Sequence, residues 1–167
     1  MKTINLKSGD YEITLLTAEE YEQYKDRIPL VKDWWWLRSP GYSSSYAAFV
    51  YFDGSVDYYG DFVYSSFDAI RPALKSDILN LHIGESFIAL GNRWVMIDDG
   101  VAISQDVITH RRFDLESNDW ETSELKSWLT EWAKEGEAAE TMKWFIECFD
   151  DALKQANVRR FPAKEGE

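Results

Sequence analysis

Apolar and polar positions at the start of the chain follow the pattern of one strand and one short helix. Residues 11–16, YEITLL, carry the aromatic and β-branched side chains that are typical of a strand. Thr17 and Glu20 follow at the spacing of a reciprocal capping box. We therefore expect a short helix from this point to about Arg27.

The next segment predicts a strand that leads into an antiparallel ribbon. Residues 34–41, WWWLRSPG, place bulky apolar side chains before a Pro-Gly turn. Residues 42–69 contain only Tyr, Ser, Phe, Asp, Ala, Val and Gly. Asp53-Gly54 and Gly60 separate short apolar runs and are typical of hairpin turns. The pattern therefore predicts a twisted ribbon over residues 42–69.

Three further strands are expected in the middle of the chain. Residues 87–90 and 93–97 read as a pair of strands around a turn at residues 91–92. Residues 101–104 follow another turn, at residues 98–100, and complete a mostly antiparallel sheet.

The last third of the chain predicts two amphipathic helices separated by Gly136. Apolar residues recur there at helical spacing in two successive stripes. The first stripe consists of Leu125, Trp128, Leu129 and Trp132, and the second of Met142, Phe145, Ile146, Phe149 and Leu153. Both stripes are expected to face the core. The single cysteine, Cys148, lies among the second set and is expected to be a buried structural thiol.

Together these elements predict an α+β fold. It consists of a twisted, mostly antiparallel sheet with ribbon loops, one short N-terminal helix and two C-terminal amphipathic helices. We expect residues 1–110 to form the sheet domain, residues 111–158 an acidic helical part packed on it, and residues 159–167 a frayed tail. With 167 residues the chain can bury enough surface for a single compact unit.

The charge balance bears on the kind of partner. Thirty acidic residues against 18 basic ones give a formal net charge of −12, which opposes contact with phosphate backbones and favours a basic protein partner. Acidity is concentrated in residues 113–151, where the alternative interpretation is a solvated helical face. No apolar stretch is long enough for a membrane span and no secretory signal is visible, so a cytoplasmic location is expected.

Catalytic and metal-binding motifs are missing from the sequence. His82 and His110 have no Cys, His or carboxylate neighbours at a metal-ligand spacing, and no phosphate-binding glycine loop or nucleophile motif occurs. We expect no enzymatic activity, metal or cofactor. An enzyme of unusual type would need a site assembled from Arg38, Asp53, His82 or His110, and no spacing favours one.

Two motifs bracket the ribbon and carry a resemblance to a known family. They are Arg38, Ser39, Pro40 and Gly41 before it, and Arg71, Pro72, Ala73 and Leu74 after it. With the run AAFVYFDGSVDYYG between them, they resemble the signature of the DUF6273 family, which is common in gut Firmicutes and their phages. The resemblance implies a scaffold like that of C-type lectins and formylglycine-generating enzymes, with binding loops and no transferable catalytic site.

A second similarity to the same family lies further along the chain. Residues 91–97 resemble its opening strand, and residues 118–129 resemble its first helix. In most members we expect these elements to precede the WWLRSPG motif, so the order here looks permuted.

The first functional hypothesis is an acidic inhibitor that occludes the basic nucleic-acid-binding groove of a bacterial defence nuclease such as Cas9. Carboxylates can occupy a channel that binds phosphates, while tyrosine anchors supply specificity. The expected acidic contacts are Glu131, Glu135, Glu137 and Glu140, and the expected aromatic contacts are Tyr58, Tyr59 and Tyr64.

The alternative is a lectin-like module that uses the ribbon to bind a glycan, a peptide or a surface protein. Tyrosine, serine, aspartate and glycine are the mixture that recognition loops use. A plain structural interpretation also stands, in which alternate aromatic residues of the ribbon face the core.

Overall fold

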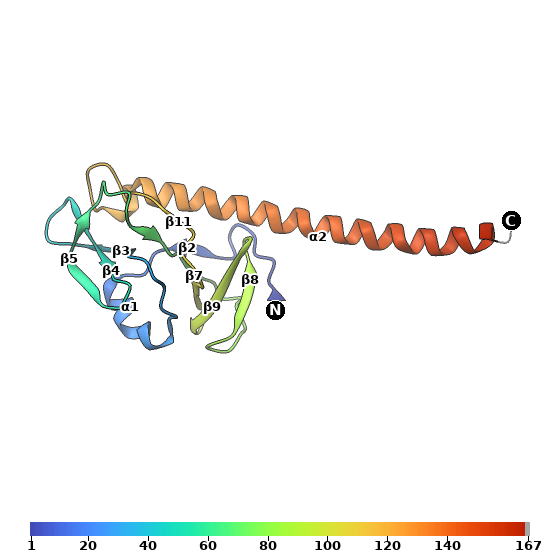
Figure 1. Ribbon diagram of the computed structural model, residues 1–167, viewed down its shortest axis with the longest axis horizontal. Coiled ribbons are helices and arrows are strands. Elements are labelled where there is room, and N and C mark those ends of the chain that lie inside the picture. The colour runs from blue at the N-terminus through green and yellow to red at the C-terminus, as the bar shows by residue number, and fades with distance from the viewer. Residues whose placement is uncertain (166–167) are drawn as a thin grey trace.

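The computed structural model describes the backbone of residues 1–165 and the side chains of residues 1–156. It shows two mostly antiparallel sheets, one short helix near the amino terminus and one long helix that follows the strands (Figure 1). The predicted α+β class is therefore confirmed. The frayed tail predicted for residues 159–167 lies outside the described side chains and stays a prediction.

One sheet has six strands in the described chain. In spatial order these are β1 (Lys2–Thr3), β8 (Ser86–Ala89), β9 (Asn92–Asp98), β10 (Val101–Ser104), β7 (Ala73–Lys75) and β2 (Glu12–Thr14). The pairing of β1 with β8 is parallel, and the other pairings are antiparallel. The strand pair expected around residues 91–92 is the β8–β9 hairpin.

The second sheet has five strands among the described residues. Their order is β11 (Thr109–His110), β6 (Ala69–Ile70), β3 (Trp35–Pro40), β4 (Tyr46–Val50) and β5 (Val56–Phe62). A parallel contact joins β3 to β6, and the other pairings are antiparallel. The predicted ribbon is therefore β4 and β5, and β5 forms the edge of the sheet.

The short helix α1 (Ala18–Tyr24) lies against these sheets and begins at the predicted capping box. Thr17 accepts from the Glu20 backbone N–H, and the Glu20 carboxylate accepts from the Thr17 backbone N–H. A 3₁₀ turn, η1 (Lys25–Arg27), continues it to the expected end. A second 3₁₀ turn, η2 (Trp120–Thr122), precedes the long helix.

Arg71 is a buried charged residue at the centre of the fold. Its guanidinium donates to the carbonyl oxygens of Pro29, Ser104 and Gln105 at 2.7 to 2.9 Å and lies over the Trp35 ring. Burial lowers the pKa of Arg71 to about 10, so the side chain stays cationic at neutral pH. The arginine of the Arg-Pro-Ala-Leu motif therefore joins two loops that are distant in sequence.

The long helix α2 (Glu124–Glu165) is continuous, so the prediction of two C-terminal helices is wrong. Gly136 lies inside this helix and does not end it; its role is to allow close packing. A Cβ atom at this position would lie 2.0 Å from the carbonyl oxygen of Leu90, in the β8–β9 turn. The glycine allows the helix backbone to approach that turn closely.

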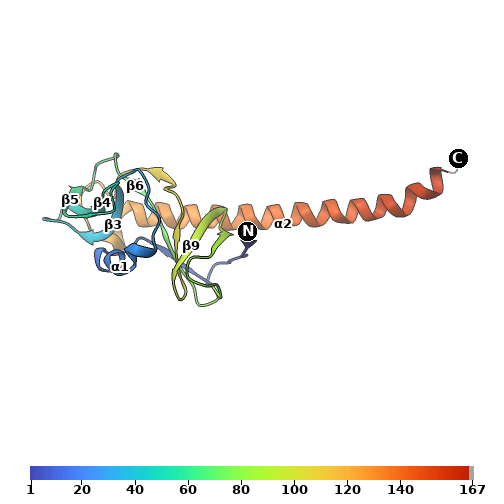
Figure 2. The same ribbon diagram turned by 60° about the horizontal axis from the view of Figure 1, so that its bottom comes forward.

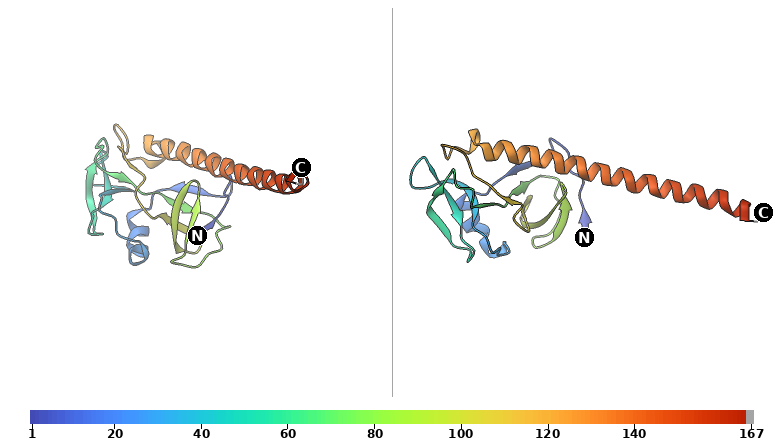
Figure 3. Two further views of the ribbon diagram at one scale, coloured as in Figure 1. Left: turned by 45° about the vertical axis from the view of Figure 1, so that its right-hand side comes forward. Right: turned by 45° about the horizontal axis from the view of Figure 1, so that its top comes forward.

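Only the first part of α2 packs on the sheets. Leu125 and Leu129 join the core beside the five-stranded sheet, and Ala133 joins the core beside the six-stranded sheet. The helix then continues beyond the strands, as the different views agree (Figures 1 and 2; Figure 3).

The second apolar stripe of α2 lies on this projecting part. Its five residues, Met142, Phe145, Ile146, Phe149 and Leu153, are 50–64% exposed, and Cys148 is exposed as well. The predictions of a second core-facing stripe and a buried thiol are therefore wrong, because the sheets do not extend far enough along the helix to cover it.

Candidate aromatic surface

The turn at the tip of the ribbon has the predicted Asp-Gly form. The Asp53 carboxylate accepts from the backbone N–H and the hydroxyl of Ser55, and Gly54 adopts a φ of +87°. This turn joins β4 to the edge strand β5, in which the Tyr58, Tyr59 and Phe62 side chains are exposed.

Five rings on and beside the ribbon form a continuous run, which we call the aromatic strip: Tyr42, Tyr46, Tyr59, Phe62 and Tyr64. Tyr42 stacks on Tyr59 with centroids 4.8 Å apart and planes 9° apart. Tyr46 meets Tyr59 edge to face, with ring centroids 5.2 Å apart. The Tyr46 ring is also tilted against Phe62, with centroids 4.5 Å apart. Phe62 stacks on Tyr64 at 5.0 Å. Each ring therefore has a neighbour in the strip.

Most of the large side chains in the aromatic strip are exposed to solvent. Tyr42 is 73% exposed, Tyr59 and Tyr64 are slightly more than half exposed, and Phe62 is 40% exposed. Aromatic side chains that stack on one another in solvent leave a contiguous apolar surface, and surfaces of this kind mark sites of interaction.

Gly60 explains how these rings share one face. It lies inside β5 with a φ of +95°, so the prediction that it marks a hairpin turn is wrong. The strand register shifts opposite it, between Ala47 and Phe49. A regular strand would turn residues three apart to opposite faces, but this bulge lets Tyr59 and Phe62 both reach Tyr46.

The predicted aromatic contacts divide between two sides of the ribbon. Tyr59 and Tyr64 belong to the strip, whereas the Tyr58 hydroxyl donates to Glu22 of α1 at 3.2 Å. Sequence reasoning missed the strip members Tyr42, Tyr46 and Phe62. Their composition signalled a recognition surface, but the bulge that brings them together could not be read from spacing.

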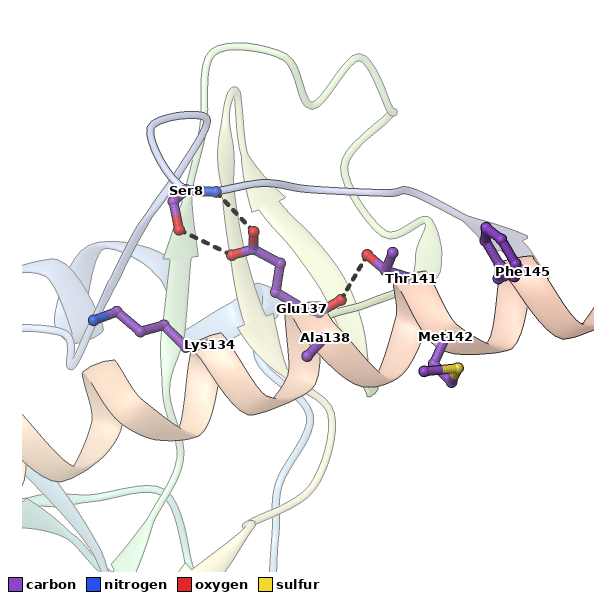
Figure 4. Close-up of a pocket in the computed structure, with 7 residues that line it drawn as sticks. All are labelled: Ser8, Lys134, Glu137, Ala138, Thr141, Met142 and Phe145. Carbon is purple, nitrogen blue, oxygen red and sulfur yellow. Dashed lines mark hydrogen bonds between the residues drawn. The ribbon is translucent and has the colours of Figure 1, made fainter.

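Glu137, one of the four predicted acidic contacts, is used inside the protein. Its carboxylate accepts from the Ser8 backbone N–H at 3.2 Å and the Ser8 hydroxyl at 3.1 Å (Figure 4). It also accepts from the Tyr11 hydroxyl at 3.2 Å. Burial and the nearby carboxylate raise the pKa of Tyr11 to about 12. Glu137 therefore attaches α2 to the amino-terminal loop.

The other three glutamates differ in exposure. Glu140 is only 8% exposed, so little of its side chain is open to a partner. Glu131 and Glu135 are exposed on α2, where Glu131 also approaches Lys134 at 3.4 Å. These two residues remain as candidate acidic contacts.

The ribbon segment that contains the strip is acidic. Segment 42–69 contains no Lys or Arg. Asp57 accepts from the Tyr51 hydroxyl and from the Gly60 backbone N–H. Asp61 follows in the same strand. The ribbon segment therefore carries negative charge and no cation of its own, although Asp57 and Asp61 pair with Phe49 and Ala47 on the face opposite Tyr46 and Phe62.

Asp68, at the end of the same segment, is fully buried, and neither carboxylate oxygen has a hydrogen-bond partner among the described residues. Burial, and next the proximity of Asp61, raise the pKa of Asp68 from 3.8 to about 9. The folded protein thus holds a proton at neutral pH that the unfolded chain releases.

The Asp68→Asn variant should therefore have a flatter pH dependence of stability. Between pH 4 and 9 the unfolded wild type binds fewer protons than the folded form, so its free energy of unfolding falls as pH rises. Removing Asp68 should abolish up to about 1.4 kcal/mol of this fall per pH unit. Urea unfolding at several pH values measures the slope. Asp77→Asn is the control, because Asp77 is exposed, and it should keep the wild-type slope. A wild-type slope in Asp68→Asn would contradict the prediction.

Residues considered for other chemistry have separate partners. Arg38 lies 4.0 Å from Glu20, and His110 lies 2.8 Å from Asp33. Within the described part of the chain, no three His, Cys, Asp or Glu residues gather as a metal site. Over the same part, no helix combines the length and apolarity needed to cross a membrane.

The fold and the strip define an α+β protein with two mostly antiparallel sheets and an exposed aromatic edge. Residues 8–77 match the model of a domain of unknown function, DUF6273. The match supports the resemblance for this segment, which runs from before β2 to just beyond β7 and includes the whole aromatic strip. The second similarity, over residues 91–97 and 118–129, lies outside it and stays a prediction. No curated protein and no solved structure matches the chain.

Proposed function

We propose that this chain is a non-enzymatic binding protein and that the aromatic strip is the surface on which it holds a basic protein partner. The observation that carries the proposal is the run of five rings at the sheet edge, each in contact with a neighbouring ring. Tyrosines offer large contact area at low rotamer cost, which is why they dominate recognition surfaces.

Electrostatics supports the choice of a basic partner. The chain carries a net charge of −12, and no cation lies within the ribbon segment. Lysine and arginine side chains of a partner could lie over the tyrosine faces and be attracted by the net negative charge of the chain. Such a complex forms quickly and weakens as salt increases.

The sharper form of this proposal is a phage-encoded inhibitor that acts in the host cytoplasm on a defence nuclease such as Cas9. In that form, Glu131 and Glu135 on α2 supply additional carboxylates, which would occupy sites that otherwise bind phosphates. Glu137 and Glu140 are assigned no role in it, because they are engaged or buried within the fold.

The second candidate is a lectin-like module that binds a glycan. It is favoured by the exposed, nearly parallel stack of Tyr42 and Tyr59, because flat aromatic faces can cover the apolar faces of sugar rings. Glycan binding through ring stacking would depend little on salt.

Binding of purified Cas9 to the immobilised protein, at low salt and at about 0.3 M salt, tests the proposal. The Tyr42→Ala/Tyr59→Ala variant should bind at least about tenfold more weakly, in line with the loss of two aromatic anchors. Tyr58→Ala is the matched control, because Tyr58 is equally exposed but points toward α1. It should bind as the wild type does.

The contribution of the helix is tested separately by Glu131→Lys/Glu135→Lys. Loss of binding in this variant would support occlusion by acidic residues. If Cas9 is not retained, a bacterial lysate and a glycan array replace it as probes. Binding of a glycan that is insensitive to salt and lost in Tyr42→Ala/Tyr59→Ala would favour the lectin-like candidate, and binding unaffected by any of these changes would reject the strip as the site.

A further inference from the structure

The projecting part of α2 carries an apolar stripe that nothing in the described chain covers. Its members are Met142, Phe145, Ile146, Phe149 and Leu153. An isolated helix without tertiary contacts is marginally stable in water, and most helical stability in proteins comes from packing of an amphipathic face. The stripe therefore needs a surface to pack on.

The stripe does not continue the face that packs on the sheets. At about 100° per residue, its centre lies about 140° around the helix axis from the buried face formed by Leu125, Leu129 and Ala133. The sheets therefore lie on nearly the opposite side of the helix, so a second helix could approach the stripe without meeting them.

Charges on the projecting part lie beside or opposite the stripe and not within it. Lys143, Glu147 and Asp151 lie about 100° or more from its centre around the axis, and Asp150 lies about 85° from it. Two copies could join their stripes without bringing these acidic residues face to face. An anionic membrane surface is a poorer match, because the polar side is mainly acidic.

The spacing of the apolar positions suits self-pairing. Counted from Phe149, Phe145 and Leu153 lie four residues away on either side, and Ile146 lies three before it. Side chains at such intervals form one seam of an interhelical contact. A seam that is nearly symmetric about one residue can match its own copy under a two-fold axis.

The exposed area is sufficient for a dimer. Half to two thirds of each side chain of the stripe is free, which corresponds to about 100 Å² per residue on the scale of buried aromatic side chains. Two copies would bury about 1,000 Å² of apolar surface, at the lower limit for a specific interface.

A groove at the base of the stripe extends the surface. Met142 and Phe145 line it together with Ala138 and Thr141 of the helix and Ser8 of the amino-terminal loop, and its volume is about 560 Å³ (Figure 4). We propose that the stripe and this groove form a homodimer interface, in which the projecting helix of a second copy packs against its equivalent.

Sedimentation velocity of the full chain over a range of concentrations tests the proposal. The wild type should sediment with twice the mass of one chain. Phe149→Glu places a charge at the centre of the stripe, at a position that is 64% exposed in the single chain. It should leave the sheets folded and raise the dimer dissociation constant at least about tenfold.

Trp144→Glu is the matched control. Trp144 is also a large apolar residue, 57% exposed, on the same projecting part, but it lies about 150° around the axis from the centre of the stripe. This variant should remain dimeric.

A monomeric wild type would overturn the proposal, as would equal loss of dimer in both variants. Vesicles of phosphatidylcholine identify the main competitor for the stripe. A monomeric wild type that binds these vesicles, with binding lost in Phe149→Glu, would assign the stripe to a lipid surface instead.

Discussion

Arg71→Met is expected to lower the free energy of unfolding by about 3 kcal/mol. The carbonyl oxygens of Pro29, Ser104 and Gln105 would lose their donors, and each buried unpaired acceptor costs about 1 kcal/mol or more. Methionine replaces the aliphatic volume of arginine but donates no hydrogen bond. Because single domains are stable by about 5–15 kcal/mol, the midpoint of urea unfolding should fall clearly.

Arg93→Met is the matched control for this prediction. Arg93 lies in β9 with an exposed side chain, so its replacement should change stability by no more than about 0.5 kcal/mol. Equal effects of the two substitutions would show that Arg71 does not hold its loops together through these carbonyl groups.

Gly136→Ala is expected to destabilise the protein by about 2 kcal/mol, even though alanine is the better helix former. Helix propensity alone would make the variant about 1 kcal/mol more stable. The added Cβ, however, would lie 2.0 Å from the Leu90 carbonyl oxygen, which forces α2 away from the β8–β9 turn. A fall in stability would therefore show that Gly136 is needed for close packing, and a rise would show that the position tolerates a side chain.

Thermal unfolding by circular dichroism measures this effect, with Thr130→Ala as its control. Thr130 is exposed on the same helix and bonds only to the Lys126 carbonyl, so alanine should be neutral or slightly stabilising there. A more stable Gly136→Ala would contradict the close approach of the helix to Leu90.

Two glycines have roles in the structure that differ from those the sequence predicts. Gly136 and Gly60 both looked like punctuation between elements, because glycine commonly ends helices and forms turns. In the structure both lie inside elements, where the missing Cβ makes room for a carbonyl oxygen of another segment. Spacing along the chain contains no information about which distant backbone comes close.

The sequence by itself determined the elements whose causes are local. The capping box at Thr17, the Asp53-Gly54 turn and the β8–β9 hairpin depend on side chains only a few residues apart. The aromatic and acidic character of the chain is likewise a property of composition.

Tertiary structure alone decided which of these residues are available to a partner. The bulge at Gly60 places the rings of the aromatic strip on one face, and Glu137 accepts hydrogen bonds from Ser8 and Tyr11. The stripe around Phe149 is exposed because α2 extends beyond the sheets. The periodicity of an amphipathic helix predicts that its apolar face packs against something. Which segment packs on that face depends on how far the rest of the fold extends along the helix.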